Sequence, residues 1–232
     1  MKKVLGSFLS ISAILLISGC ITTEITAQET RDLKPFTGIG IGISADVFYT
    51  QGNGHVIKIE GNERDVKDLI TEVENGYLKI KYDDWRIKRS KLTIHITSSE
   101  LEKVAMSGSG KFRAEKNVSS DEMILKISGS GVVQFSSLEA DEMEVSISGS
   151  GNAVLEKGSA DEMGVKISGS GKLLAEQFGV EELEAAISGS GSCRITVEDE
   201  LNARISGSGS VYYHGNPEVN SVASGSGKVR AL

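Results

Sequence analysis

Hydrophobic and polar residues alternate in short runs around a repeated tetrapeptide, Ser-Gly-Ser-Gly, in the second half of the chain. Hydrophobic residues stand five, three and one positions before its first Ser, as in Met143, Val145 and Ile147, and five and seven positions after it, as in Ala153 and Leu155. This period of two indicates β-strands, so each repeat predicts a strand, a bend and a second strand. The tetrapeptide begins at Ser107, Ser128, Ser148, Ser168, Ser188, Ser206 and Ser224.

Repeat spacings of 18 to 21 residues are typical of a solenoid with one structural unit per coil. The fold class predicted is all-β, a right-handed parallel β-helix or solenoid with about 20 residues per coil. We expect Met123, Met143 and Met163 to stack in the core. A second inward column is Ile127, Ile147, Ile167 and Ile187. The outward positions between these columns are Lys126, Ser146 and Lys166. The glycines allow a tight bend, and stacked Ser hydroxyls are expected to bond from coil to coil.

Residues 35–106 lack the tetrapeptide but are also rich in strand patterns. Hydrophobic residues alternate from Ile39 through Ile43 to Tyr49, and Asn75-Gly76 between two strand-like runs predicts a hairpin. One or two helical turns are expected near residues 63–70. We interpret residues 35–106 as the opening part of the same solenoid, followed by the Ser-Gly-Ser-Gly coils over residues 107–232.

The first twenty residues form a targeting pattern. Lys2 and Lys3 precede an apolar stretch that is too short to span a bilayer, and the stretch ends in Ser18-Gly19-Cys20. This pattern resembles the bacterial lipobox, which predicts a signal peptide over residues 1–19 and a lipid anchor on Cys20; an ordinary secretory signal is the alternative. Residues 20–34 are polar and aperiodic, which predicts a tether. The expected location is the bacterial cell envelope, with the outer membrane favoured and its face left open.

Composition narrows the classes of function. The chain has 232 residues and a net charge of −7, which argues against a nucleic-acid partner. Two cysteines far apart, Cys20 and Cys193, supply neither a disulfide framework nor a thiolate metal site. Cys193 occupies an inward position, so a buried inert thiol is expected. No cofactor is predicted.

Paired acids are the strongest candidate for chemistry. They recur once per coil and are expected to form columns along one edge of the solenoid. We prefer solvated turns, since these acids lack the Gly-rich loops of calcium-binding β-rolls, but bridging cations remain the alternative. The weak metal candidates are Asp121, Glu122, Asp141, Glu142, Asp161 and Glu162, and similar pairs follow at residues 181–182 and 199–200.

Other motifs favour structural interpretations. Gly110-Lys111 and Gly227-Lys228 lack the Ser or Thr of a phosphate loop, and the glycines of residues 38–42 lie in a strand pattern, which favours backbone packing. A serine hydrolase needs a His within reach of its Ser, but all three histidines lie outside the tetrapeptides. No catalytic residue is predicted.

Several motifs together resemble a known family. They are Phe36-x-x-Ile39, Gln51-Gly52, the strand pair of residues 72–80 and the Ser-Gly-Ser-Gly coils. The chain is similar over residues 36–231 to the bacterial envelope family named putative autotransporter adhesin, head GIN domain. It departs from the family pattern at Ser99-Glu100-Leu101, where a Pro is expected before the Leu. The resemblance implies a β-helical envelope lipoprotein and no catalytic residues.

Three functions remain. The preferred one is a lipid-tethered binding, adhesion or structural module with a protein or glycan partner. A self-stacking assembly protein is next, because no capping helix follows residues 228–231 and this C-terminal edge could pair with a second copy. Tyr212, Tyr213 and Pro217 are expected to cover the edge in part. A carbohydrate-active enzyme ranks last, and would need a cleft with Trp85, Tyr77 or Tyr82 beside acids.

Overall fold

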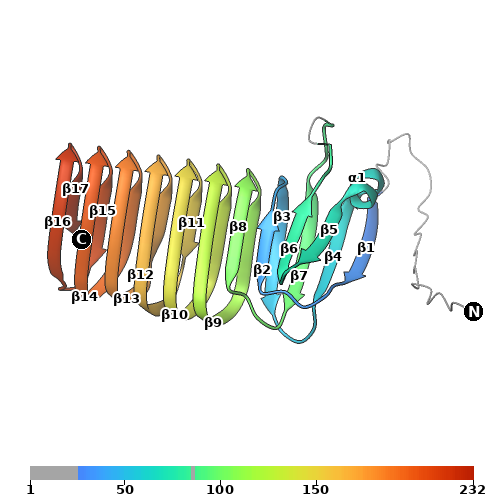
Figure 1. Cartoon of the computed structure of the whole chain (residues 1–232), viewed down its shortest axis with the longest axis horizontal. Helices are drawn as coiled ribbons and strands as arrows, with labels where there is room; N and C mark the ends of the chain where they lie inside the picture. Colours follow the sequence, from blue (N-terminus) through green and yellow to red (C-terminus); the bar gives the residue numbers. More distant parts are fainter. Residues whose placement is uncertain (1–25, 85–86) are drawn as a thin grey trace, which may run out of the picture.

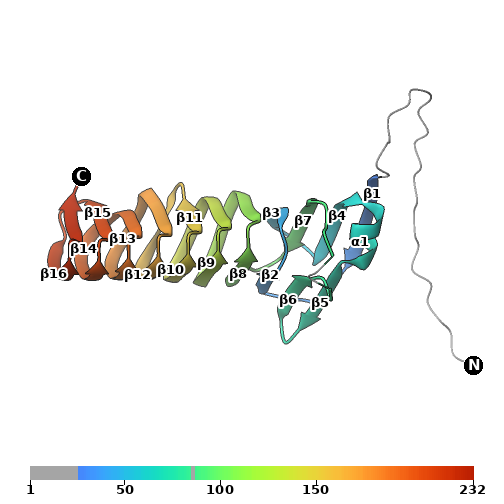
Figure 2. The ribbon, with the colours of Figure 1, turned by 90° about the horizontal axis from the view of Figure 1, so that it is seen from above.

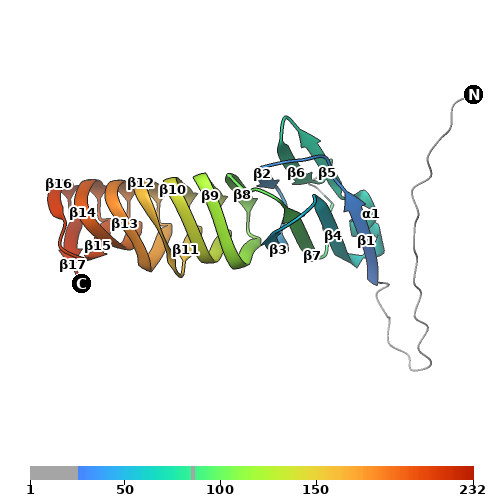
Figure 3. The ribbon, with the colours of Figure 1, turned by 90° about the horizontal axis from the view of Figure 1, so that it is seen from below.

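The computed structural model describes residues 26–84 and 87–232, which form an elongated rod with a right-handed coil (Figure 1). Each coil has two strand segments on opposite sides of a flat core (Figures 2 and 3). We call the segments that run into the bends the leading sheet and those that follow the bends the trailing sheet. The long strands bend at a corner and contribute to both sheets. They are β9 (Lys111–Gly129), β10 (Val132–Gly149), β13 (Lys172–Gly189) and β14 (Ser192–Gly207).

The remaining strands each belong to one sheet. In the leading sheet they are β2 (Gly38–Ile41), β5 (Ile70–Glu74), β6 (Tyr77–Lys81), β8 (Lys103–Gly108), β12 (Gly158–Gly169) and β16 (Glu218–Gly225). In the trailing sheet they are β1 (Thr26–Asp32), β3 (Ala45–Gln51), β4 (Val56–Asn62), β7 (Leu92–Ser98), β11 (Asn152–Leu155), β15 (Ser210–His214) and β17 (Lys228–Ala231).

The repeat region stacks in parallel register, which confirms the predicted solenoid. Met143 pairs with Met123 on one side and Met163 on the other, and all three are buried. The isoleucine column is buried in the same way, from Ile127 to Ile205. Ser146 is half-buried, where an exposed side chain was expected. Its neighbours in register are Lys126 and Lys166, whose longer side chains flank it.

Backbone amides hold the bends together, and the expected ladder of Ser hydroxyls is wrong. Ser150 N donates to Gly129 O at 2.9 Å, and Asn152 N donates to Gly131 O at 3.0 Å; later coils repeat both bonds. Among the described residues, no hydroxyl of the tetrapeptides bonds another protein group. Because amides already link the coils at the strand spacing, the hydroxyls are left to solvent.

The two glycines of a bend have different roles. Gly149 has φ of +112°, a conformation that side chains with a Cβ rarely adopt. A Cβ on Gly151 would lie 2.5 Å from Ile127 Cγ2 and 2.8 Å from Gly131 O in the preceding coil. The first glycine therefore makes the turn, and the second allows close stacking of the coils.

In the opening part of the chain, the order of the coils along the rod differs from their order in the sequence. The first coil, β2 with β3, lies between the β6–β7 coil and the β8–β9 coil: β2 pairs with β6 and β8, and β3 pairs with β7 and β9. All four pairings are parallel, so this part joins the repeat coils through continuous ladders. The predicted Asn75-Gly76 hairpin joins β5 to β6, and both turn residues have positive φ.

The end of the rod opposite the last coil is closed by antiparallel elements (Figure 1). Strand β4 pairs with β7, and β1 pairs with β4. Helix α1 (Glu63–Asp68) lies against both β1 and β4 and begins at Asn62, whose Oδ1 accepts from Arg64 N. Residues 26–32, expected as part of a tether, are thus a strand. Arg31 fixes it by donating to the carbonyl oxygens of Leu69 and Val66.

Candidate functional site

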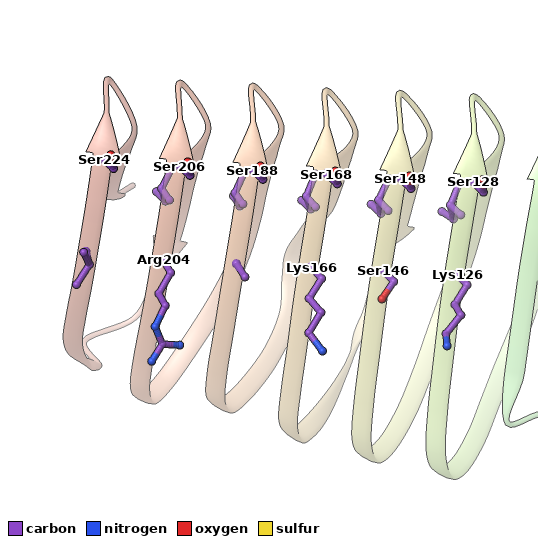
Figure 4. Close-up of a pocket in the computed structure, with 17 residues that line it drawn as sticks. Lys126, Ser128, Ser146, Ser148, Lys166, Ser168, Ser188, Arg204, Ser206 and Ser224 are labelled. Atoms are coloured by element: carbon purple, nitrogen blue, oxygen red, sulfur yellow. The ribbon is translucent and has the colours of Figure 1, made fainter.

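A groove lies on the outer face of the leading sheet (Figure 4). It crosses the coils, with a volume of about 800 Å³. One border is the column of first Ser residues of the tetrapeptides, from Ser128 to Ser224. The other border is formed by the residue two positions before this Ser in each coil. The isoleucine column lies between these two positions in the sequence. This second border, which we call the variable column, is Lys126, Ser146, Lys166, Ala186, Arg204 and Val222.

Long and short side chains alternate along the variable column. Cations stand on every second coil, at Lys126, Lys166 and Arg204, which at the strand spacing places them about 9.6 Å apart. Lys166 Nζ lies 3.4 Å from Glu144 Oε1, and Arg204 Nη1 lies 2.7 Å from Glu184 Oε1. These exposed pairs contribute about 0–1 kcal/mol each, so the cations remain available to a ligand.

The lining of the groove combines hydroxyls, cations and apolar side chains. It contains serines, isoleucines, two lysines, one arginine, Ala186 and Val222, with no His, Asp or Glu. The Ser hydroxyls can donate and accept, and they have no described partner in the protein. A ligand lying along the rod would meet one hydroxyl per coil and one cation per two coils.

The acidic residues form one ordered column at the corner between the sheets. Glu142 is in register with Glu122 and Glu162, and the same column continues through Glu182 and Glu200 to Glu218. Asp121, Asp141 and Asp161 are exposed beside it and are skipped by the ladder register. Among the described residues, no three acids, histidines or cysteines come together closely enough to hold a metal ion.

The tyrosines named for an enzyme cleft have packing roles. Tyr77 covers the backbone of residues 38–40: a Cβ on Gly40 would lie 2.6 Å from its hydroxyl oxygen, which confirms backbone packing for these glycines. Tyr82 donates to Asp65 O and stacks with Arg89, whose guanidinium carbon is 4.4 Å from the ring centroid. Burial raises the pKa of Tyr82 to about 12. Trp85 lies outside the described residues.

One Ser–His contact in the structure was not predicted from the sequence. His55 Nε2 lies 3.4 Å from Ser99 Oγ, because β3 and β7 bring distant turns together. The other ring nitrogen, Nδ1, is buried and has no hydrogen-bond partner among the described residues. Without a carboxylate at Nδ1, the contact lacks the group that orients the base in a catalytic triad.

Of the two cysteines, Cys193 lies among the described residues. Cys193 is fully buried between Leu173 and Val211 of the adjacent coils. Desolvation raises the pKa of its thiol to about 12, which keeps the thiol protonated and unreactive at neutral pH. Cys20 and the predicted signal peptide lie outside the described residues. Within residues 26–84 and 87–232, no helix is long and apolar enough to cross a membrane.

Comparison with known proteins identifies the family of this solenoid. The model of the family described as "Putative auto-transporter adhesin, head GIN domain" matches residues 35–217. The chain belongs to this family. The resemblance inferred from the sequence motifs is thereby confirmed. No curated protein matches the chain.

Solved structures share the head GIN fold. A putative adhesin from Bacteroides fragilis is 22% identical with a TM-score of 0.82, over 90% of this chain and 98% of its own. A putative adhesin from Parabacteroides merdae is 24% identical with a TM-score of 0.74, over 90% and 97%. A putative lipid binding protein from Parabacteroides distasonis is 24% identical with a TM-score of 0.74, over 90% and 98%.

The last coil of this head GIN chain lies beyond the family match. Strand β16 pairs only with β14, and β17 only with β15, so one edge of each has no described partner. Val219, Val222 and Leu232 are exposed by 37%, 70% and 55%. Tyr212 and Tyr213, which were expected to cover the edge in part, lie on β15, one coil inside it, and the half-buried Pro217 directly precedes β16.

Proposed function

We propose that this head GIN protein is a lipid-anchored binding or adhesion module of the bacterial cell envelope. The groove on the leading sheet carries the proposal, because it offers a repeated set of hydroxyls without a described protein partner, together with exposed cations at regular spacing along the rod. The family description and the adhesin names of the solved relatives support an adhesion-like envelope role. The lipobox pattern ending at Cys20 supports attachment through lipid, with the outer membrane as the favoured site.

Anchoring is tested by replacing the lipidated residue. Cells expressing the full chain are labelled with a radioactive fatty acid and fractionated. We expect label on the wild-type protein in the membrane fraction, and neither label nor membrane retention for Cys20→Ala. Equal membrane retention of an unlabelled Cys20→Ala protein would contradict the lipid anchor.

Binding is tested with soluble protein that lacks residues 1–20, on immobilised mucin and on purified peptidoglycan. The double variant Ser148→Gln and Ser168→Gln places longer side chains in the groove. The matched control is Ser150→Gln and Ser170→Gln, since the second Ser of each bend is exposed but does not line the groove. We expect only the first pair to reduce retention. Equal retention of both variants and wild type would overturn the groove as the binding surface.

A second candidate function is end-to-end assembly, favoured by the exposed apolar residues and unpaired strand edges of the last coil. In an isologous dimer, β16 of one copy would pair with β16 of the second copy, and β17 with β17, antiparallel in both sheets. Light scattering on the soluble form should show a concentration-dependent dimer that Val229→Lys abolishes. Val154→Lys, at an outward position in the middle of the trailing sheet, is the control. A monomer at tens of micromolar, unaffected by Val229→Lys, would exclude the contact.

A further inference from the structure

A second, smaller pocket lies on the trailing sheet, on the opposite face of the rod from the groove. It is formed where β3 is held between β7 and β9, and its volume is about 120 Å³. Liquid water occupies about 30 Å³ per molecule, so this space matches one small polar group such as a carboxylate or phosphate and not a whole sugar ring. The lining residues are Asp46, Val47, Phe48, Lys91, Lys111 and Arg113.

The register explains how these residues meet. Phe48 on β3 pairs with Arg113 on β9, and Asp46 pairs with Lys111, so the two cations stand next to each other on the same face of β9. Lys91 precedes β7 and reaches Asp46, with Nζ 2.7 Å from Oδ2. Three cations and one carboxylate therefore line the pocket, and that carboxylate is already paired with Lys91.

The side chains of Lys111 and Arg113 have no described ion pair or hydrogen bond. Among the described arginines, only Arg113 and Arg230 lack an ion pair. Two adjacent unpaired cations repel each other, and an anion bound between them would relieve that repulsion.

An aromatic wall adjoins the cations. The rings of Phe48 and His95 are stacked, with centroids 5.2 Å apart and planes at 17°. His95 lies on β7, so it covers the side of Phe48 away from β9 and leaves the side toward Arg113 for a ligand. An apolar ring face beside a few convergent polar groups is the usual composition of a small-molecule site.

From these contacts we propose that the pocket binds a sugar that carries an anionic group. The carboxylate or phosphate sits between Lys111 and Arg113, and the sugar ring extends out of the pocket along Phe48. Arg113 supplies a planar fork of donors for the anion, while Lys111 supplies a point charge. The pocket and the groove share no lining residue, so ligand binding in the pocket is tested independently of the function proposed above.

The test measures binding to soluble protein lacking residues 1–20 by NMR titration, with glucuronate, glucose 6-phosphate, glucose and inorganic phosphate as probes. We expect millimolar affinity for the two anionic sugars, weaker binding of phosphate and no binding of glucose. Affinity should fall as sodium chloride is raised. Equal affinity for phosphate and glucose 6-phosphate would overturn the role of the sugar ring, and equal affinity for glucose would overturn the role of the cations.

Variants locate the site. Arg113→Gln and, separately, Lys111→Gln should each weaken glucuronate binding by about tenfold or more. Arg113→Lys keeps the charge but loses the fork and should fall between wild type and Arg113→Gln. The matched control is Arg230→Gln, because Arg230 is also unpaired on the outer face of the trailing sheet but lies in the last coil. Unchanged binding in Arg113→Gln, or no binding of either anionic sugar to wild type, would overturn the proposal.

Discussion

At the scale of single residues, space inside the bends is the strictest requirement of this fold. From Gly151 to Gly227, the second glycine of each tetrapeptide faces the isoleucine of the preceding coil, and there is no room for a methyl group between them. The repeated motif identified both glycines in the sequence. The stacked coils show that the first glycine is needed for its positive φ and the second for lack of space. The serine between them has neither a positive φ nor a described hydrogen bond from its hydroxyl.

Gly151→Ala is therefore expected to destabilise the rod by about 1–3 kcal/mol, the usual cost of overpacking a tightly packed site. The added Cβ would approach Ile127 Cγ2 and Gly131 O. Urea unfolding of the soluble form measures the change, and Ser150→Ala in the same bend is the control, with little expected effect. Equal stability of the two variants would contradict the close approach.

The buried thiol of Cys193 predicts a pH dependence. Burial raises its pKa to about 12, against about 8.5 for cysteine in an unfolded chain. The contribution of this group to stability is complete below about pH 8.5, and it is lost at about 1.4 kcal/mol per pH unit as the unfolded thiol ionises. Wild type should lose stability faster than Cys193→Val between about pH 9 and pH 10 in urea unfolding. Parallel pH profiles would contradict this effect.

At the scale of elements, the sequence predicted local ladders well and long-range partners poorly. Inward columns such as Met123, Met143 and Met163 were predictable because each coil repeats the same spacing. Strand β1 was missed because it carries almost no hydrophobic signal and is fixed by Arg31. The pocket beside Phe48 was missed because the β3–β9 pairing joins residues about 65 positions apart, which no local pattern indicates.

The glutamate column is an element with a testable electrostatic cost. Like charges at the strand spacing of about 4.8 Å repel by about 1 kcal/mol per pair in water before screening. We expect the melting temperature to rise with sodium chloride, and millimolar calcium to add nothing beyond a monovalent salt of equal ionic strength. A much larger shift with calcium would make the column a metal site.

Two variants distinguish repulsion within the glutamate column from the effect of net charge on stability. Glu142→Gln interrupts the column between Glu122 and Glu162 and should raise stability at low salt. Glu139→Gln removes the same charge from the same coil, but Glu139 stacks between Ser119 and Ser159 and should have little effect. An equal change in both variants would show that net charge alone matters.

At the scale of the whole molecule, the rod has two unlike ends. Antiparallel strands and α1 cover one end, while β16 and β17 leave one edge each without a described partner. In a solenoid each coil is stabilised mainly by its neighbours, so the coil with one neighbour should open most easily. We expect amide hydrogen exchange to be fastest in β16 and β17 and slowest in β10 and β12. Uniform protection along the rod would indicate that the last coil is covered in solution.

The position of the first coil imposes an order on folding. Strands β2 and β3 are made early, but their partners β6, β7, β8 and β9 all follow them in the chain. A chain that emerges from a ribosome or an export channel with its N-terminus first cannot bury Ile39, Ile41, Val47 or Tyr49 until residue 114 has appeared. At about 5–20 residues per second this takes seconds. The hydrophobic segment 36–51 is therefore the part of the nascent protein with the longest exposure to aggregation and to chaperones.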